Sequence, residues 1–351
     1  MPRSLLITGA TGRQGGAAIR SLVSRNADFR LLAVTRDKTS PSAQKLASLS
    51  PKITLLQGDL NKTDALFQHA RDVTGSSPWG VFSVQVKTHN NNTQSPIKLT
   101  WKENATPQSS NSHLHPSKKA LQPGPKGPPV EQSQGTSLID SALKAGVKHF
   151  VYSSVDRHGQ KSLANPTDIP HFISKHNIEH HLINSTRSSS SSSSAAAAAA
   201  AAAMSWTILR PVAFMENLDG GFFGKLFATL VKAKLSPQKP LQLVATEDIG
   251  QAAAEAFLRP EEYSGKAISL AGDEVTFRQL SDIFREKTGS PVPVTWDFMA
   301  GAVLALSKEM RTMFSFFERE GYGADIAALR RQYPQLKDLR TWLETSPYMK
   351  K

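Results

Sequence analysis

Three glycines near the N-terminus constrain the fold of this chain more than any other feature. Gly9, Gly12 and Gly15 stand at three-residue intervals between an apolar run, residues 5–7, and a helix-like run, residues 17–23. The apolar run predicts a buried strand, and a tight turn after it needs residues without a Cβ atom. The N-terminus of the following helix then favours the pyrophosphate of a dinucleotide. Such glycines would also suit a flexible loop, but the strand before them and the helix after them favour a nucleotide site.

The second apolar run, residues 31–35, indicates which dinucleotide the chain binds. It ends in Arg36, Asp37 and Lys38. Folds that prefer NAD usually carry an acidic residue at this strand tip, whereas NADP sites carry an arginine. Arg36 can bind a 2′-phosphate through two hydrogen bonds, and Lys38 adds a positive charge. The alternative is a set of ordinary solvated loop charges, since Asp37 stands between them. The tip therefore favours NADP(H) over NAD(H).

The predicted cofactor contacts extend to the ends of the next strands. A third apolar run, residues 53–57, leads into Gly58, Asp59 and Leu60, where such folds contact the adenine ring. Asp59 would do so through a side-chain oxygen and Leu60 by packing. Asn61 could equally cap the next helix. The contacts expected from the turn and the strand ends are Gly9, Ala10, Thr11, Gly12, Arg13, Gln14, Gly15, Arg36, Asp37, Lys38, Gly58, Asp59, Leu60, Val84 and Gln85.

Apolar runs alternate with helical patterns along the first part of the chain. We expect a fourth strand over residues 80–85, a helix over residues 136–144, a fifth strand over residues 149–154 and a sixth over residues 205–210. This alternation favours right-handed βαβ units and a parallel sheet. The fold class expected is α/β: a Rossmann-type, doubly wound parallel sheet followed by a smaller, mainly helical C-terminal lobe.

Several motifs together resemble the NmrA-like family, a branch of the atypical short-chain dehydrogenases. The G-x-x-G-x-x-G spacing is usual in these relatives, and the resemblance covers most of the chain apart from two insertions. The other motifs that carry it are Val34-Thr35-Arg36, Gln57-Gly58-Asp59, the run 146–154, the run 170–175 with Ile178-Glu179, Leu209-Arg210-Pro211, Phe214-Met215-Glu216-Asn217-Leu218, Asp248-Ile249-Gly250 and Trp342-Leu343.

The resemblance implies further cofactor contacts after the sixth strand. In NmrA-like relatives this segment lies over the nicotinamide end of the cofactor, which implies contacts from Phe214, Met215, Glu216 and Asn217. Glu216 and Asn217 are the polar members and are expected to face the site. One of Phe214 and Met215 could instead pack in the core.

The catalytic residues are less clear from the sequence. Active short-chain dehydrogenases use Tyr-x-x-x-Lys on one helix face, where the lysine lowers the tyrosine pKa and the tyrosine moves a proton. Lys175 resembles that lysine, but His171 stands four residues before it, and Tyr152 lies on the preceding strand. Histidine can act as an acid or base, although His171 could simply form hydrogen bonds at a helix start. Lys175 is expected to contact the cofactor.

Two insertions interrupt the expected nucleotide-binding domain, which spans residues 1–218 with a return segment near 240–258. Residues 87–130 are poor in large apolar side chains, so we expect disorder, either as a genuine loop or as a gene-model artefact. Residues 187–203 form a serine and alanine tract. Residues 219–351 are expected to form a lobe for a substrate or partner, with the site in the cleft between the lobes.

Composition excludes several functions. The chain has no cysteine, which rules out disulfides and cysteine–zinc sites. The net charge is +13, but no helix-turn-helix, zinc-finger or aromatic-interleaved basic pattern is present, so we do not expect direct nucleic-acid binding. An apolar strand close to the N-terminus leaves no room for a signal peptide, and no run is long enough to span a membrane. We expect a cytoplasmic protein, with access to the nucleus left open. Six lysines of the first insertion contribute to the charge: Lys87, Lys98, Lys102, Lys118, Lys119 and Lys126.

Two functions remain. The resemblance implies an NADP(H)-responsive regulator that acts through a protein partner, a transcriptional or metabolic regulator, and the missing active-site tyrosine favours this hypothesis. The alternative is an NADPH-dependent oxidoreductase of a small substrate, for example a secondary metabolite. Lys175 and the expected cleft are compatible with it. The sequence identifies neither the partner nor the substrate, nor the oligomeric state.

Overall fold

The structure of the protein, a computed structural model, describes residues 3–85, 129–188, 204–346 and 348–349. Its main sheet has seven parallel strands in the order β3-β2-β1-β4-β5-β6-β9. The strands are β1 (Arg3–Ile7), β2 (Phe29–Thr35), β3 (Ile53–Gln57), β4 (Gly80–Ser83), β5 (His149–Ser153), β6 (Ser205–Pro211) and β9 (Lys266–Leu270). The doubly wound α/β fold expected from the sequence is confirmed.

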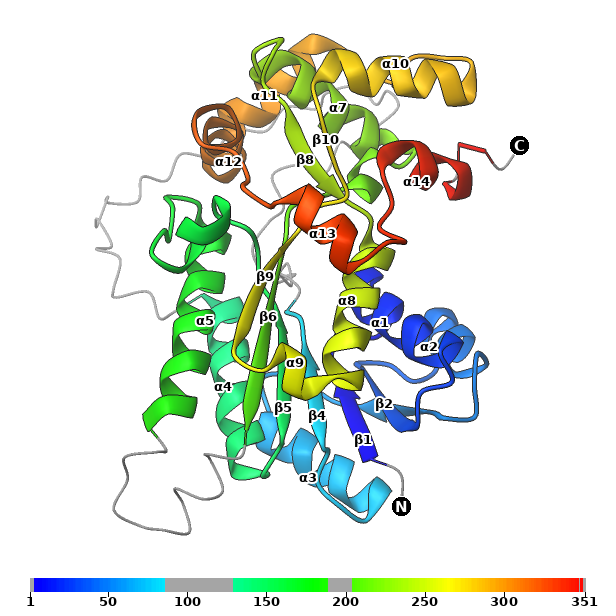
Figure 1. The fold of residues 1–351 in the computed structure, drawn as a ribbon, viewed down its shortest axis with the longest axis vertical. Helices are drawn as coiled ribbons and strands as arrows, with labels where there is room; N and C mark the ends of the chain where they lie inside the picture. Colours follow the sequence, from blue (N-terminus) through cyan, green and yellow to red (C-terminus); the bar gives the residue numbers. More distant parts are fainter. Residues whose placement is uncertain (1–2, 86–128, 189–203, 347, 350–351) are drawn as a thin grey trace, which may run out of the picture.

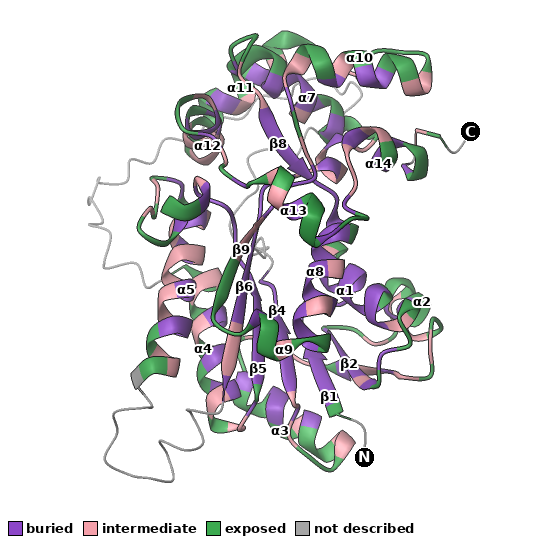
Figure 2. Ribbon diagram, in the orientation of Figure 1, coloured by how far each residue is buried: buried purple, intermediate pink, exposed green. Residues whose placement is uncertain are grey.

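Helices cover both faces of this sheet (Figure 1). Neighbouring residues of a strand point to opposite faces, so Leu5 and Ile7 pack with the helices of one face, whereas Leu6 packs with those of the other. The first face carries α1 (Arg13–Ser24), α2 (Pro41–Ala47), α8 (Thr246–Leu258) and, beyond them, α9 (Pro260–Tyr263) and α13 (Ile326–Gln332). The second carries α3 (Thr63–Thr74), α4 (Val130–Lys144) and α5 (Pro170–Ser188). Figure 2 shows that the inner strands of the sheet are buried along most of their length, whereas the edge strands β3 and β9 are partly exposed.

A second lobe lies beyond the carboxyl ends of the strands (Figure 1). Its small sheet has the strand order β10-β8-β7, and its own apolar core includes Phe284, Phe314, Phe317 and Leu343. Its elements are β7 (Ala213–Phe214), η2 (Met215–Leu218), α7 (Phe222–Lys234), β8 (Leu241–Val244), β10 (Asp273–Val275), α10 (Phe277–Thr288), α11 (Asp297–Leu306), α12 (Lys308–Arg319) and α14 (Leu339–Thr345). One 3₁₀ helix, η1 (Gly159–Leu163), follows β5.

Some segments differ from the sequence-based expectations. The helix predicted over residues 136–144 starts at Val130, because Gly135 lets its first turns pack closely against Ile178 of α5. β9 follows Tyr263, in a stretch that we expected in the second lobe, yet it is the edge strand of the main sheet. Asn61 does not cap α3, since Lys62 holds that position, and the Asn61 side chain accepts a hydrogen bond from Gln134 instead.

Most of both insertions lies outside the described residues. Of the first, only Pro129 and Val130 are described, and they form the start of α4. Of the serine and alanine tract, Arg187 and Ser188 end α5. Within the part of the chain that the structure describes, no helix is long and apolar enough to cross a membrane.

Candidate functional site

The glycine turn joins β1 to α1 where the strand order of the sheet reverses. β1 pairs with β2 on one side and with β4 on the other, and ligands of such sheets bind at this switch point. Gly9 has a φ of 58°, in the left-handed region that favours glycine, and its carbonyl oxygen accepts a hydrogen bond from Gly12 N–H at 2.9 Å. A Cβ atom on Gly15 would lie 2.4 Å from that carbonyl oxygen, so α1 can begin this close to the turn only with glycine.

The open side of the turn fits the pyrophosphate of NADP(H). Gly12 is the N-cap of α1, and no side chain caps the first N–H groups of the helix. A Cβ atom on Gly12 would approach only the Gly9 carbonyl oxygen, at 3.1 Å, among the described residues. The space in front of the turn is therefore open, and uncapped N–H groups at a helix start bind anions.

The end of β4 lies directly against this turn. The Thr8 hydroxyl donates to the carbonyl oxygen of Val84 at 3.0 Å and accepts from Val84 N–H at 2.8 Å. Val84 and Gln85 follow the last strand residue, Ser83, rather than belonging to the strand. Gln85 donates to the Ser83 hydroxyl, and its buried Oε1 has no hydrogen-bond partner within the described ranges. Val84 thus stands beside the turn, and Gln85, the next residue, offers an acceptor without a partner among the described residues.

The tip of β2 presents its positive charges to solvent, where the ribose 2′-phosphate of NADP(H) would lie. Arg36 is exposed. The Asp37 carboxylate instead accepts hydrogen bonds from the hydroxyl and N–H of Thr39, at 2.6 and 2.8 Å, and these bonds lower the pKa of Asp37. Asp37 is therefore bound within its own turn, which leaves the cations as the groups available to a ligand.

The adenine-side residues lie at the end of β3. Asp59 is exposed, and its Oδ1 accepts hydrogen bonds from both the N–H and the side-chain amide of Asn61 at 2.9 Å. Leu60 is half-buried against the core on the α3 side of the sheet. Gly58 packs closely against Leu66 of α3.

Lys175 is linked to the glycine turn through two short contacts. Its Nζ lies 3.4 Å from the carbonyl oxygen of Ser153, whose hydroxyl donates to Gln14 Oε1 at 2.5 Å. Nζ also forms an ion pair with Glu131 at 3.0 Å, and both side chains are largely buried. Residues from α1, β5, α5 and α4 therefore meet at one place, although they are distant in sequence.

Tyr152 is unsuited to replace the missing catalytic tyrosine. Its ring is fully buried beside Lys175, with Nζ 5.9 Å from the ring centre. Its hydroxyl has no hydrogen-bond partner in the described part of the chain. Burial, together with the negative charges of Glu131 and Glu179, raises the pKa of Tyr152 well above its usual value. A hydroxyl in this position cannot release a proton readily at neutral pH.

His171 lies one helical turn before Lys175, at the start of α5. Its Nδ1 lies 2.7 Å from Oε1 of Glu309 on α12, and each side chain is 27% exposed. Figure 1 shows α12 above the first turn of α5, so this contact crosses between the lobes.

The segment after β6 lies where the two lobes join. Met215 is completely buried in the core of the second lobe, and Phe214 is half-buried against the core of the first. The Glu216 carboxylate accepts hydrogen bonds from Thr246 at the start of α8 and from Trp342 of α14. Glu216 thus joins α8 to α14. Asn217 is half-exposed and could still face a ligand.

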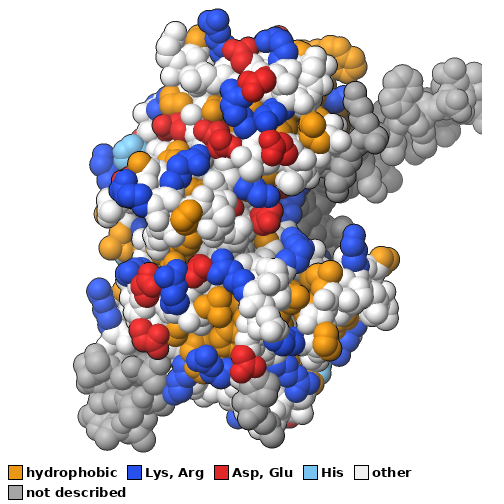
Figure 3. Space-filling model, turned by 45° about the vertical axis from the view of Figure 1, so that its right-hand side comes forward, with side chains coloured by type: hydrophobic (Ala, Val, Ile, Leu, Met, Phe, Trp, Pro, Cys, Tyr) orange, Lys and Arg blue, Asp and Glu red, His pale blue; other side chains and the backbone are white. Residues whose placement is uncertain are grey.

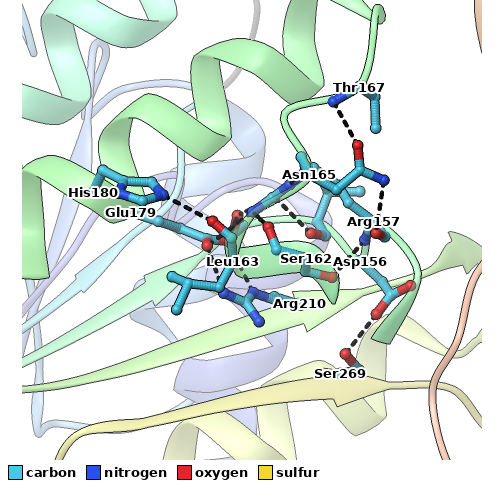
Figure 4. A network of polar contacts seen from close by, with 12 residues as sticks. Asp156, Arg157, Ser162, Leu163, Asn165, Thr167, Glu179, His180, Arg210 and Ser269 are labelled. Carbon is cyan, nitrogen blue, oxygen red and sulfur yellow. Dashed lines mark hydrogen bonds and ion pairs between the residues drawn. The ribbon is translucent and has the colours of Figure 1, made fainter. Parts of the chain in front are cut away.

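A buried ion cluster beneath the site had no role in the sequence analysis. Glu179 of α5 forms ion pairs with Arg157 at 2.9 Å and with Arg210 of β6 at 2.7 Å (Figure 4). All three side chains are almost completely buried. Burial alone would raise the pKa of Glu179, but the hydrogen bonds from Arg210 and the charge of Arg157 outweigh it and lower the pKa. Glu179 and Arg210 occur in the motifs above, but only their burial reveals the cluster, which fixes α5 against the sheet.

Asp156 connects the same region to the second lobe. Its carboxylate accepts a hydrogen bond from Ser269 of β9 at 2.5 Å (Figure 4). It accepts another from Gly323 N–H at 2.9 Å. Gly323 lies between α12 and α13, so the loop after β5 holds the chain where it returns from the second lobe.

Residues 1–96 and 125–343 match the NmrA-like family. The chain belongs to the NmrA-like family. Among curated relatives, an NmrA-like family domain-containing oxidoreductase, hkm9, of Aspergillus hancockii is 28% identical over 295 residues, which cover 82% of this chain and 73% of the relative.

Solved structures share the fold of this NmrA-like protein. One is NmrA, a negative transcriptional regulator, in complex with NADP, with a TM-score of 0.62 and 14% identity over 99% of this chain and 100% of the other. Another is the triphenylmethane reductase of Citrobacter sp. complexed with NADP(H), with a TM-score of 0.62 and 16% identity over 98% and 99% of the two chains. At these identities the likeness shows the fold alone.

The surface of this NmrA-like protein carries mixed charge on the face drawn in Figure 3. Lys and Arg side chains there are interspersed with Asp and Glu. No continuous basic stripe crosses that face, as a nucleic-acid backbone would favour.

Proposed function

We propose that this protein is an NADPH-dependent oxidoreductase that acts on a small substrate next to the glycine turn. The observation that carries the proposal is the polar path from Gln14 through Ser153 to Lys175, with His171 one turn earlier in α5. It places an ammonium group and an imidazole next to a turn that fits a dinucleotide. The oxidoreductase name of the fungal relative and the NADP(H) bound to the two solved structures support it.

Different residues would bind the cofactor and transfer the proton. The N–H groups at the start of α1 bind the pyrophosphate, and Arg36 and Lys38 hold the 2′-phosphate. Lys175 binds the nicotinamide ribose. NADPH supplies a hydride when bound, and His171 supplies or accepts the accompanying proton. Gln85 would orient the nicotinamide end through Oε1, which has no hydrogen-bond partner among the described residues.

A second candidate is the NADP(H)-responsive regulator, acting through a protein partner. The ion pair between Lys175 and Glu131 favours it, because the carboxylate neutralises the ammonium group that activates a proton donor in related enzymes. A regulator would bind the cofactor without turning it over. The cytoplasmic location expected from the sequence stays a prediction in either case.

One assay separates the two candidates. The wild-type protein is incubated with NADPH and each member of a panel of quinones, ketones, aldehydes and imines, and loss of NADPH absorbance is followed. An oxidoreductase consumes NADPH with at least one substrate at a rate proportional to enzyme concentration. NADPH binding measured by calorimetry without any turnover across the panel would favour the regulator instead.

A further inference from the structure

The contact between His171 and Glu309 determines which ring nitrogen carries a proton. A carboxylate can only accept a hydrogen bond, so the nitrogen 2.7 Å from Glu309 must be protonated. That nitrogen is Nδ1. Nε2 is then the nitrogen left to exchange a proton with another group. A carboxylate that orients an imidazole in this way also stabilises the ring when it becomes positively charged.

The ring is held by aromatic contacts as well as by the carboxylate. It packs edge-on against Phe172, with ring centres 4.7 Å apart, and Phe172 packs edge-on against Phe316 of α12 at 5.7 Å. Phe172 and Phe316 are fully buried. The start of α5 and the helix that carries Glu309 are thus packed together, and this packing holds the carboxylate next to the ring.

His171 also stands on the side of α5 that carries Lys175. Residues four positions apart lie on one face of a helix, about 6 Å from each other. Lys175 contacts the Ser153 carbonyl oxygen, and Ser153 contacts Gln14 in the glycine turn. His171 is therefore close to the place where the nicotinamide end of a dinucleotide bound at this turn would lie.

We propose that Glu309 is a positioning residue for the proton transfer carried out by His171, an inference that rests on the proposed oxidoreductase function. In carbonyl reduction, bound NADPH would supply a hydride to the substrate carbon, and the charged ring would give its Nε2 proton to the oxygen, so that an alcohol and NADP⁺ would result. The ring would then be neutral and keep its Nδ1 proton against Glu309, and a proton taken up from bulk solvent would restore the charged ring. Because Glu309 belongs to the second lobe, the proton donor is complete only when the two lobes are packed together.

Glu320 provides a matched control. It lies at the other end of the same helix, and its Oε2 accepts a hydrogen bond from Asn165 of the first lobe at 3.0 Å. Glu320→Ala therefore removes an interlobe contact of similar kind without touching His171. A purely structural effect of losing a carboxylate between the lobes should appear in both variants.

The first test observes the ring directly in the protein without cofactor. Nitrogen NMR of ¹⁵N-histidine-labelled protein is recorded at about pH 9, where a histidine ring is ordinarily neutral, and the His171 signals are those missing from His171→Ala. We expect an Nδ1–H ring in the wild type, in Glu320→Ala and in Glu309→Gln, whose amide oxygen still accepts. Glu309→Ala should shift the ring toward Nε2–H. An unchanged ring in folded Glu309→Ala overturns the inference.

The second test uses a substrate found in the NADPH panel. Glu309→Ala should lower kcat about 10- to 100-fold, less than complete loss of a general acid, while KM and the NADPH dissociation constant change less than twofold. Glu309→Gln should recover part of kcat, and Glu320→Ala should retain it. Equal loss in Glu309→Ala and Glu320→Ala would overturn the positioning role. If the ring responds as expected but no substrate is turned over, the positioning of His171 stands and the proposed oxidoreductase function fails.

Discussion

The two ends of the candidate site are built in different ways. The phosphate end is made mainly from the backbone of one short segment, the glycine turn with the first turn of α1. The proton-transfer end is made from the side chains of Glu131, Ser153, Lys175, His171 and Glu309, which come from α4, β5, α5 and α12. A backbone site depends on the absence of Cβ atoms and tolerates changes around it. A side-chain site depends on how distant elements pack. The same molecule should therefore lose its two capabilities through different kinds of substitution.

The largest effect is expected from a side chain added at the phosphate end. Gly12→Val should abolish NADPH binding and leave the protein folded, because the new side chain occupies the approach of the pyrophosphate. Calorimetric titration and circular dichroism measure the two properties. Gly301→Val is the matched control, since it adds the same side chain to an exposed helix position with open space around it. Normal NADPH affinity in Gly12→Val would mean that the turn does not hold the phosphates.

At the other end, removing one ring should separate turnover from binding. His171→Ala is expected to lower kcat by about 10²–10⁴-fold, the usual contribution of a general acid, with NADPH affinity nearly unchanged. Lys175→Ala should instead weaken NADPH binding, because its ammonium group would face the nicotinamide ribose. Steady-state kinetics and calorimetry on both variants test this division. A His171→Ala enzyme with full kcat would remove the histidine from the mechanism.

The joint between the two lobes should respond to pH. Burial raises the pKa of Asp248 to about 7, while its Oδ2 accepts a hydrogen bond from Lys337 N–H. The folded protein then holds a proton that the unfolded chain releases above about pH 4, so Asp248 lowers stability progressively as pH rises from about 4 to about 7. Asp248→Asn should remove that loss, with a gain of at most about 3 kcal/mol at pH 8 relative to pH 5. Urea unfolding of both proteins at the two pH values measures it, and parallel pH profiles would contradict the assignment.

The smallest effect concerns the choice of cofactor. Arg36→Ala should weaken NADPH binding by about 1.5–3 kcal/mol, roughly 10- to 100-fold, because a charged hydrogen bond to the 2′-phosphate is lost. NADH affinity should not change, since NADH lacks that phosphate. Arg278→Ala, an exposed arginine on α10, is the control. Equal weakening of both cofactors would show that Arg36 acts on the turn rather than on the phosphate.

The difference between the two ends also explains what the sequence could predict. The glycine turn and the tip at Arg36 are local, so spacing along the chain was enough to locate them and the sheet around them. Glu309 lies 138 positions from His171, and no local pattern connects a residue of the second lobe with one of the first. For Glu216, a cofactor contact stays a prediction that rests on the family resemblance, whereas its partners Thr246 and Trp342 depend on tertiary packing that no local pattern reveals.

The buried ion cluster limits which single substitutions this sequence can accept during evolution. Losing Arg157 or Arg210 alone would leave Glu179 with an incompletely paired charge out of contact with water, which typically costs about 3–5 kcal/mol. Three apolar side chains of similar total volume at these positions could give an equally or more stable protein. Each single substitution on the way to that combination, however, lowers the stability of the folded protein. The three positions are therefore expected to be inherited as a unit, and any homologue that lacks one of them should carry compensating changes at the other two.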